Sequence, residues 1–119
     1  MPQYSKDYFN KTTKTILSPW FRFFLKYDPK TALQNISIPV LALNGEKDIQ
    51  VDPDQNLTAI ENILKSNSNK NYKVMKLPGL NHLFQTAKTG STYEYGNIKE
   101  TFSPDALKVI GDWIKEITK

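Results

Sequence analysis

The strongest constraint on the fold is a continuous apolar run over residues 38–43, which reads Ile-Pro-Val-Leu-Ala-Leu and ends at Asn44-Gly45. A short run without polar alternation is typical of a strand that is buried on both faces, as in parallel sheets. Pro39 falls at the beginning of this strand, where a missing N–H donor is tolerated. A second strand is predicted over residues 72–77, directly before Pro78-Gly79. These two segments are the candidate strands of the fold.

A helix is predicted between the two strands. Asp52 and Pro53 form its start, and Gln55 stands three residues after the aspartate. Its apolar stripe consists of Leu57, Ile60, Ile63 and Leu64. A strand–helix–strand unit with apolar strands implies a right-handed crossover between parallel strands. The predicted fold class is therefore α/β, with parallel strands and flanking helices.

A last helix is predicted after Ser103-Pro104, and its apolar stripe comprises Ala106, Ile110, Trp113, Ile114 and Ile117. Residues 86–101 are polar and contain glycines, which favours a loop or a small excursion. The short polar stretch at 66–71 predicts a loop that ends the first of these helices.

The beginning of the chain is predicted to form two segments. Residues 1–17 show no sustained period and indicate an irregular arm or a frayed helix, whereas residues 18–119 form the single α/β domain. Ser18-Pro19 begins a helix that Asp28-Pro29 ends. Its aromatic cluster over residues 20–25 is too dense for a free surface helix, so we expect it to pack in the core.

The composition excludes several classes of function. The chain has no cysteine and one histidine among its 119 residues, so disulfides, a cysteine nucleophile and a histidine-rich metal site are not expected, and no cofactor is implied. Residues 1–30 hold all of the net charge of +4, yet 15 of the 16 basic residues are lysine, which disfavours nucleic-acid recognition by arginine. No apolar run reaches the roughly 18 residues of a membrane span, and no export signal is recognised. We therefore expect neither a nucleic-acid nor a membrane partner, and the compartment stays open.

Two polar loops follow the two predicted strands. Residues 44–48 come after the first strand and residues 79–84 after the second. In open α/β sheets, functional residues lie beyond the carboxyl ends of the strands. Neighbouring strands are about 4.8 Å apart, so residues of adjacent loops can come into contact. Asp48 of one loop is therefore within reach of His82 of the other, and a carboxylate on Nδ1–H leaves Nε2 free to act as a base. Taken alone, a single histidine in such a loop is more often a surface or core residue, and an aspartate at the position of Asp48 is more often a turn residue.

The segments IPVLALNGEKDIQV, KLPGLNHLFQ and ETFSPDALKVIGDWI together resemble the C-terminal half of α/β-hydrolases, in the serine esterase and acyl-peptidase-like branch. The likeness covers roughly residues 18–117, with strand, acid, helix, strand, histidine and final helix in the family order. It implies that Asp48 is the catalytic acid and His82 the catalytic histidine. Glu46 and Asp52 are the alternative acids, and Asp48 is preferred because it matches the G-x-x-D turn of the family.

The sequence departs from the family in its nucleophile. None of the glycines flanks a serine in a G-x-S-x-G pattern, and the oxyanion-hole segment is also missing. We interpret the chain as the C-terminal portion of an α/β-hydrolase fold whose N-terminal half is absent, and expect it to be inactive alone. The complete enzyme would cleave a small-molecule ester or related acyl compound. A non-catalytic binding or scaffolding module with the same fold is the alternative.

The resemblance also has a consequence for assembly. In the family sheet, the strand at 38–44 pairs on both sides, but the strands that precede it are missing here. Unpaired N–H and C=O groups along an apolar strand attract other strands. We therefore expect a homo-oligomer that forms through this open sheet edge or by exchange of residues 1–30.

Overall fold

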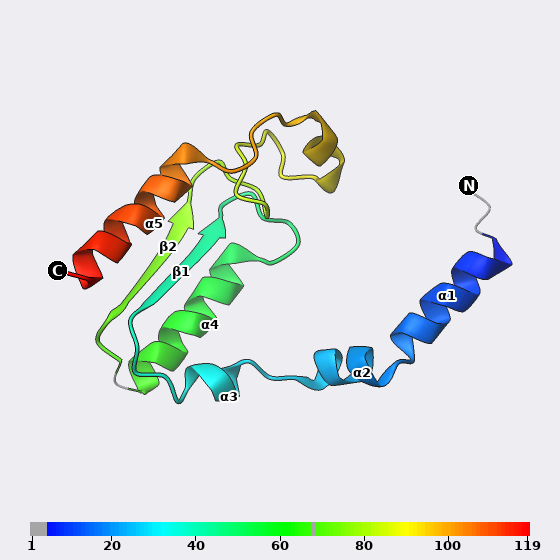
Figure 1. Ribbon diagram of the computed structural model, residues 1–119, viewed down its shortest axis with the longest axis horizontal. Coiled ribbons are helices and arrows are strands. Elements are labelled where there is room, and N and C mark those ends of the chain that lie inside the picture. Colours follow the sequence, from blue (N-terminus) through cyan, green and yellow to red (C-terminus); the bar gives the residue numbers. More distant parts are fainter. Residues whose placement is uncertain (1–4, 68) are drawn as a thin grey trace.

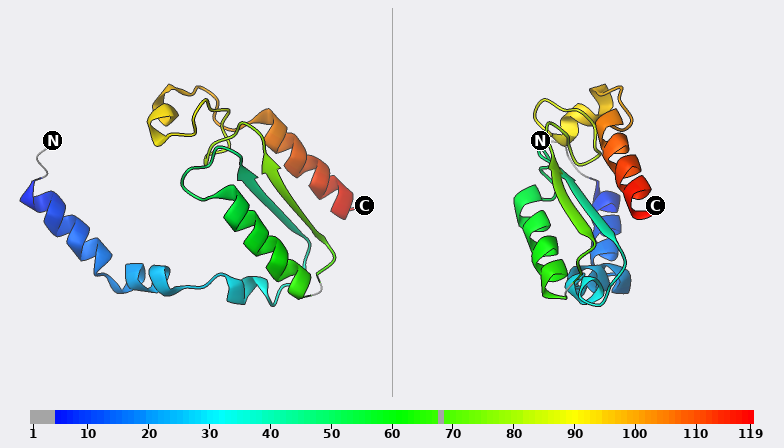
Figure 2. Two further views of the ribbon diagram at one scale, coloured as in Figure 1. Left: turned by 180° about the vertical axis from the view of Figure 1, so that it is seen from behind. Right: turned by 90° about the vertical axis from the view of Figure 1, so that its left-hand side faces the viewer.

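The protein is described by a computed structural model, which covers residues 5–67 and 69–119. Two parallel strands, β1 (Val40–Gly45) and β2 (Tyr72–Leu77), form its sheet, with Val40 opposite Tyr72 and Gly45 opposite Leu77. Helix α4 (Pro53–Ser66) connects them and covers one face of the sheet, and α5 (Pro104–Ile117) covers the other (Figures 1 and 2). The predicted mixed α/β class and the parallel pairing are confirmed.

The connecting helix begins and packs as its sequence predicts. The Asp52 side chain accepts a hydrogen bond from the backbone N–H of Gln55 at 2.8 Å, and Pro53 occupies the first turn. Leu57 and Leu64 are its buried leucines, and Leu64 is fully buried. The structure ends α4 at Ser66, as expected for the polar stretch at 66–71, in which Ser68 lies outside the described residues.

The final helix packs through its first turns. Ser103 caps α5 through the N–H of Ala106, which is fully buried against Leu77 and Leu80. Partly buried apolar side chains surround this cluster: Leu43, Met75, Phe84, Phe102 and Val109. Residues 86–101 run above the strand ends and include a short 3-10 helix, η1 (Thr92–Asn97). The main core therefore lies directly beneath the two loops that follow the strands.

The N-terminal segment is helical, the second of the two alternatives expected for residues 1–17. Helix α1 (Lys6–Ile16) begins where the Ser5 side chain accepts a hydrogen bond from Tyr8 N–H, and residues 1–4 lie outside the described part. Helix α2 (Pro19–Lys26) follows, and the short α3 (Lys30–Leu33) leads to the body. We name residues 5–27 the arm; it extends away from the sheet (Figure 1).

The expectation that the aromatic cluster packs in the core was wrong. Trp20, Phe23 and Phe24 are 67%, 65% and 59% exposed. The chain leaves α2 at Asp28-Pro29 and carries the arm away from the sheet, so the rings pack on one another instead, with Trp20 stacked on Phe24 at 5.7 Å between ring centroids. Among the described residues, no helix is long and apolar enough to cross a membrane.

The arm gives the chain an unusually large surface. The accessible area is 9273 Å², whereas a compact monomer of 13.7 kDa exposes about 6,600 Å². The radius of gyration is 18.1 Å, against about 13.5 Å for a compact chain of this length. The arm and the edges of the small sheet therefore leave roughly 2,700 Å² more surface in water than a compact fold does.

Leu64 provides a test of the α4 packing. We expect Leu64→Ala to lower the free energy of unfolding by about 2–5 kcal/mol, because it opens a cavity between α4 and the sheet. Leu107→Ala, at a residue 56% exposed on α5, serves as the matched control and should change stability by about 0.5 kcal/mol or less. Urea denaturation followed by circular dichroism measures both, and equal losses would contradict the packing described.

Candidate functional site

Two loops meet at the carboxyl edge of the sheet, where both strands end in register. The loop after β1 hydrogen-bonds to the end of β2 and to the loop beyond it: Glu46 N–H donates to Leu77 C=O at 2.8 Å, and Lys47 N–H to Leu80 C=O at 2.9 Å. These bonds join segments about 30 residues apart in the chain into one rigid corner. The candidate site is built on this corner.

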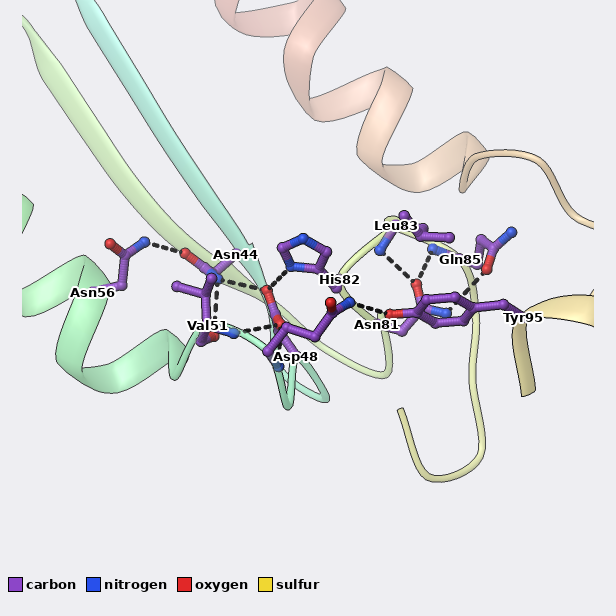
Figure 3. A network of polar contacts seen from close by, with 10 residues as sticks. Asn44, Asp48, Val51, Asn56, Asn81, His82, Leu83, Gln85 and Tyr95 are labelled. Atoms are coloured by element: carbon purple, nitrogen blue, oxygen red, sulfur yellow. Dashed lines mark hydrogen bonds and ion pairs between the residues drawn. The ribbon is translucent and has the colours of Figure 1, made fainter. Parts of the chain in front are cut away.

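Asp48 and His82 are brought together as the sequence predicts. Nδ1 of His82 lies 2.9 Å from Oδ2 of Asp48 (Figure 3). The Asp48 side chain is 4% exposed, whereas the His82 side chain is 38% exposed. The carboxylate is therefore enclosed in protein, and the imidazole lies between it and solvent.

The Asp48 carboxylate is fixed by four hydrogen bonds. Oδ1 accepts from Gln50 N–H at 3.0 Å and from Val51 N–H at 2.9 Å, and Oδ2 accepts from the Asn44 amide at 3.1 Å as well as facing His82. Burial alone raises the pKa of this carboxyl, but the hydrogen bonds from Val51, His82 and Gln50 outweigh it and hold the pKa below its ordinary value. Asp48 is therefore ionised at neutral pH despite its burial.

This arrangement sets the tautomer of His82. With Asp48 ionised, Nδ1 is assigned as the N–H donor, and Nε2 then carries the lone pair. Nε2 makes no hydrogen bond to any residue of the described ranges, and the ring is partly exposed. An imidazole held in this way can accept a proton at Nε2, while the carboxylate stabilises the imidazolium that forms.

The two alternative acids have other roles. The Glu46 side chain accepts a hydrogen bond from Gly79 N–H at 2.8 Å, which again ties the two loops together. The Asp52 side chain caps α4 through Gln55 N–H. Neither carboxylate contacts His82, so Asp48 is the partner that the structure selects among the three.

Asn81 is a residue of the site that the sequence reasoning missed. Its side chain is fully buried; Oδ1 accepts from Leu83 N–H at 3.0 Å and from Gln85 N–H at 2.9 Å, and Nδ2 donates to the Gln85 side chain. Phe84, in the same turn, has a φ of 56°, a left-handed conformation that is rare for an aromatic residue. Asn81 therefore holds the backbone that carries His82. An asparagine set beside the histidine within the apolar sequence of Leu80 and Leu83 was the available signal.

Asn44 was also missed. It is a buried polar residue near the end of β1, a strand that is otherwise apolar. Its side-chain amide donates to Asp48 and, at 3.4 Å, to Val51 C=O. Its Oδ1 accepts from the Asn56 side chain of α4 at 2.6 Å. A polar chain therefore runs from α4 through Asn44 and Asp48 to His82 (Figure 3). The signal was an uncharged polar side chain at the end of a strand that is otherwise apolar.

The 86–101 segment borders the site through two side-chain hydrogen bonds. The Gln50 side chain donates to the Tyr95 hydroxyl at 2.6 Å, and the Lys47 ammonium donates to Ala87 C=O at 2.8 Å. Six of the seven serines lie in the described residues, and none of their hydroxyls hydrogen-bonds to His82; Ser68 lies outside. The described chain therefore brings the acid and the histidine together without a serine hydrogen-bonded to them.

Comparisons with known proteins give no match, whether against protein-family models, curated proteins or solved structures. Within the described ranges, no cluster of three or more His, Cys, Asp or Glu residues could hold a metal ion. The geometry of Asp48, His82 and the residues that hold them is therefore the basis for assigning a function.

Gly45 allows a test of how the two loops meet. A Cβ on Gly45 would overlap the carbonyl oxygens of Leu80 and Asn81, which are backbone atoms and cannot move aside. We expect Gly45→Ala to cost about 2–4 kcal/mol of stability. Gly111→Ala on α5 meets nothing within 4 Å and should stabilise the protein by about 0.5–1 kcal/mol. Chemical denaturation distinguishes the two, and a neutral Gly45→Ala would show that the loops are not in contact.

The depressed pKa of Asp48 predicts an acid-sensitive contribution to stability. Because the folded pKa lies below the unfolded one, this contribution is present at neutral pH and is lost as the pH falls below about 4 and through the folded pKa. We expect Asp48→Asn to lower the free energy of unfolding by about 1–3 kcal/mol at pH 7. The free energy of unfolding of this variant should also fall less steeply than that of the wild type as the pH is lowered. Denaturation curves at pH 7 and pH 3 measure the difference, and identical pH dependence in both proteins would contradict the assignment.

Proposed function

We propose that this chain carries the acid and the histidine of a serine hydrolase triad, with Asp48 orienting His82 and Nε2 of His82 acting as the general base. The observation that carries the proposal is the 2.9 Å contact between the two side chains at the carboxyl edge of a parallel sheet. The buried, ionised carboxylate and the partly exposed imidazole suit these two roles. No cofactor takes part in this chemistry.

The reaction class follows from what such a pair can activate. An Nε2 base removes the proton of a serine hydroxyl as the oxygen attacks an acyl carbon, and later returns it to the leaving group. The acyl group passes to the serine and then to water, so an ester or a related acyl compound is the proposed substrate. The resemblance of residues 18–117 to the C-terminal half of α/β-hydrolases supports the same class.

The nucleophile and the oxyanion-hole donors are proposed to come from a further polypeptide segment. This chain contains no G-x-S-x-G sequence. An acid–histidine pair without a nucleophile cannot form an acyl-enzyme. The chain is therefore proposed to be the C-terminal part of a hydrolase and inactive by itself.

A fluorophosphonate probe tests the isolated chain. We expect no adduct in the intact mass of the 119-residue protein and no saturable hydrolysis of a p-nitrophenyl ester. A stoichiometric adduct that His82→Ala abolishes would show that one of the seven serines is activated here, and peptide mapping would identify it. That result would overturn the proposal that the nucleophile lies elsewhere.

The gene upstream of Met1 tests the proposal itself. We expect an in-frame segment with a strand, a G-x-S-x-G turn and a helix, and labelling of the joined polypeptide by the probe. His82→Ala should reduce the labelling rate by about 10³-fold or more, and Asp48→Asn by a comparable or smaller factor. The Lys108→Ala variant, at an exposed residue of α5, is the control and should label normally. An upstream region without such a segment would favour the non-catalytic binding module instead.

A further inference from the structure

We propose that Asn44 and Asn56 are positioning residues of the acid–histidine pair, through which helix α4 determines which nitrogen of His82 carries the proton. The proposal rests on the proposed roles of Asp48 as the acid and His82 as the base. It concerns how the fold imposes those roles, because three consecutive hydrogen bonds lead from α4 to the imidazole (Figure 3).

The side-chain amide of Asn44 contacts the same carboxylate oxygen that faces the imidazole. Its Nδ2 donates to Oδ2 of Asp48 at 3.1 Å, and this Oδ2 lies 2.9 Å from Nδ1 of His82. The other carboxylate oxygen, Oδ1, accepts instead from the backbone N–H groups of Gln50 and Val51. Within residues 5–67 and 69–119, Asn44 is therefore the one residue besides His82 that hydrogen-bonds to Oδ2.

Asn44 also connects the carboxylate to the sheet. Gln50 and Val51 belong to the same loop as Asp48, so their N–H groups move with the carboxylate if the loop shifts. Asn44 lies on β1 instead, where it is paired with β2 and 5% exposed. Its Nδ2 also donates to Val51 C=O at 3.4 Å, which ties the loop to the strand. The position of Oδ2 relative to the strand end, and hence to His82, therefore depends on Asn44.

Asn56 determines which way the Asn44 amide faces. A reversed amide would turn its Oδ1 toward the Asp48 carboxylate, and two acceptors cannot hydrogen-bond to each other. Asn56 donates to Oδ1 of Asn44 at 2.6 Å, which favours the orientation that presents the Nδ2 donor to the carboxylate. Asn56 stands on α4 directly before the buried Leu57, so the packing of the helix fixes its position.

The position of Oδ2 in turn decides the tautomer of His82. A neutral imidazole can carry its proton on either nitrogen, and the hydrogen bond that one nitrogen makes selects the form. With Oδ2 held on Nδ1, the proton stays there and Nε2 keeps the lone pair that the proposed base requires. If Oδ2 moves away, the Nε2–H form becomes populated, and in that form Nε2 cannot accept a proton. An asparagine that only stabilises the fold would not move this proton.

Nitrogen-15 NMR of the full 119-residue chain measures the tautomer directly. His82 is the only histidine in the sequence, so both imidazole nitrogen signals belong to it. At about pH 9, where imidazoles are ordinarily neutral, we expect the Nδ1–H form to predominate in the wild type. Asn44→Ala should lower the ratio of Nδ1–H to Nε2–H by roughly 5-fold or more, because hydrogen bonds to charged groups are the stronger ones. Asn56→Ala should lower the same ratio by a smaller factor.

Asn69→Ala is the matched control. Asn69 is also buried, at 8% exposed, but its side chain donates to Ile38 C=O at 3.0 Å beside the start of the strands, at the opposite end of the sheet from His82. We expect this variant to lower the free energy of unfolding, as Asn44→Ala does, and to keep the wild-type ratio of tautomers. An equal fall of the ratio in both variants would overturn the proposal, because it would show a general loosening of the fold.

An unchanged ratio in Asn44→Ala would also overturn the proposal. If circular dichroism shows that Asn44→Ala does not fold, Asn56→Ala decides, because Asn56 is half-buried on α4 and alanine favours a helix; an unchanged ratio in that variant would overturn the proposal as well. A predominant Nε2–H form in the wild type would instead contradict the pairing of Asp48 with His82, and with it the proposed function. The two failures therefore give different spectra.

Discussion

The parallel pairing of β1 with β2 is the interaction on which the rest of the structure depends. Because the strands run in the same direction and end opposite each other at Gly45 and Leu77, the loops that follow them leave the sheet at one edge. The helical crossover α4 is required to bring the chain back for a parallel partner, and its buried leucines seal one face. Asp48 and His82 meet because of this topology and not because they are near in sequence.

The site shows how a buried charge is accommodated. Taking the Asp48 carboxylate out of water is costly, and the cost is offset by two backbone N–H groups, the Asn44 amide and the His82 ring. These donors also fix where the carboxylate points. Asn81 fixes the loop of His82 in a similar way. Its Oδ1 accepts hydrogen bonds from the backbone N–H groups of Leu83 and Gln85, which have no strand partner there. Stability and orientation therefore come from the same hydrogen bonds.

Periodicity and loop chemistry predicted the strands and both flanking helices, because these depend on local signals: an apolar run, a cap, a strand end. The proximity of Asp48 and His82 followed instead from the expected parallel topology and from the family resemblance. Asn44 and Asn81 were missed because their importance comes from burial and from the direction of their side chains, which the residue pattern does not show, although their partners lie within 12 residues in the chain. The arm was misjudged for the opposite reason. Aromatic density at Trp20 and Phe24 predicts burial, but it does not specify a surface of this chain to pack against.

The exposed arm, the uncharged edge of β1 and the uncovered Nε2 of His82 have one physical feature in common. Each group could make a favourable contact that the described structure does not supply: the aromatic rings with an apolar surface, the strand edge with another strand, and Nε2 with a proton donor. Apolar surface and backbone groups that remain in water gain no stabilisation from burial or from hydrogen bonds within the protein. The described structure therefore orders three kinds of group that it leaves in contact with solvent: the aromatic rings of the arm, the backbone groups on the open side of β1, and Nε2 of His82.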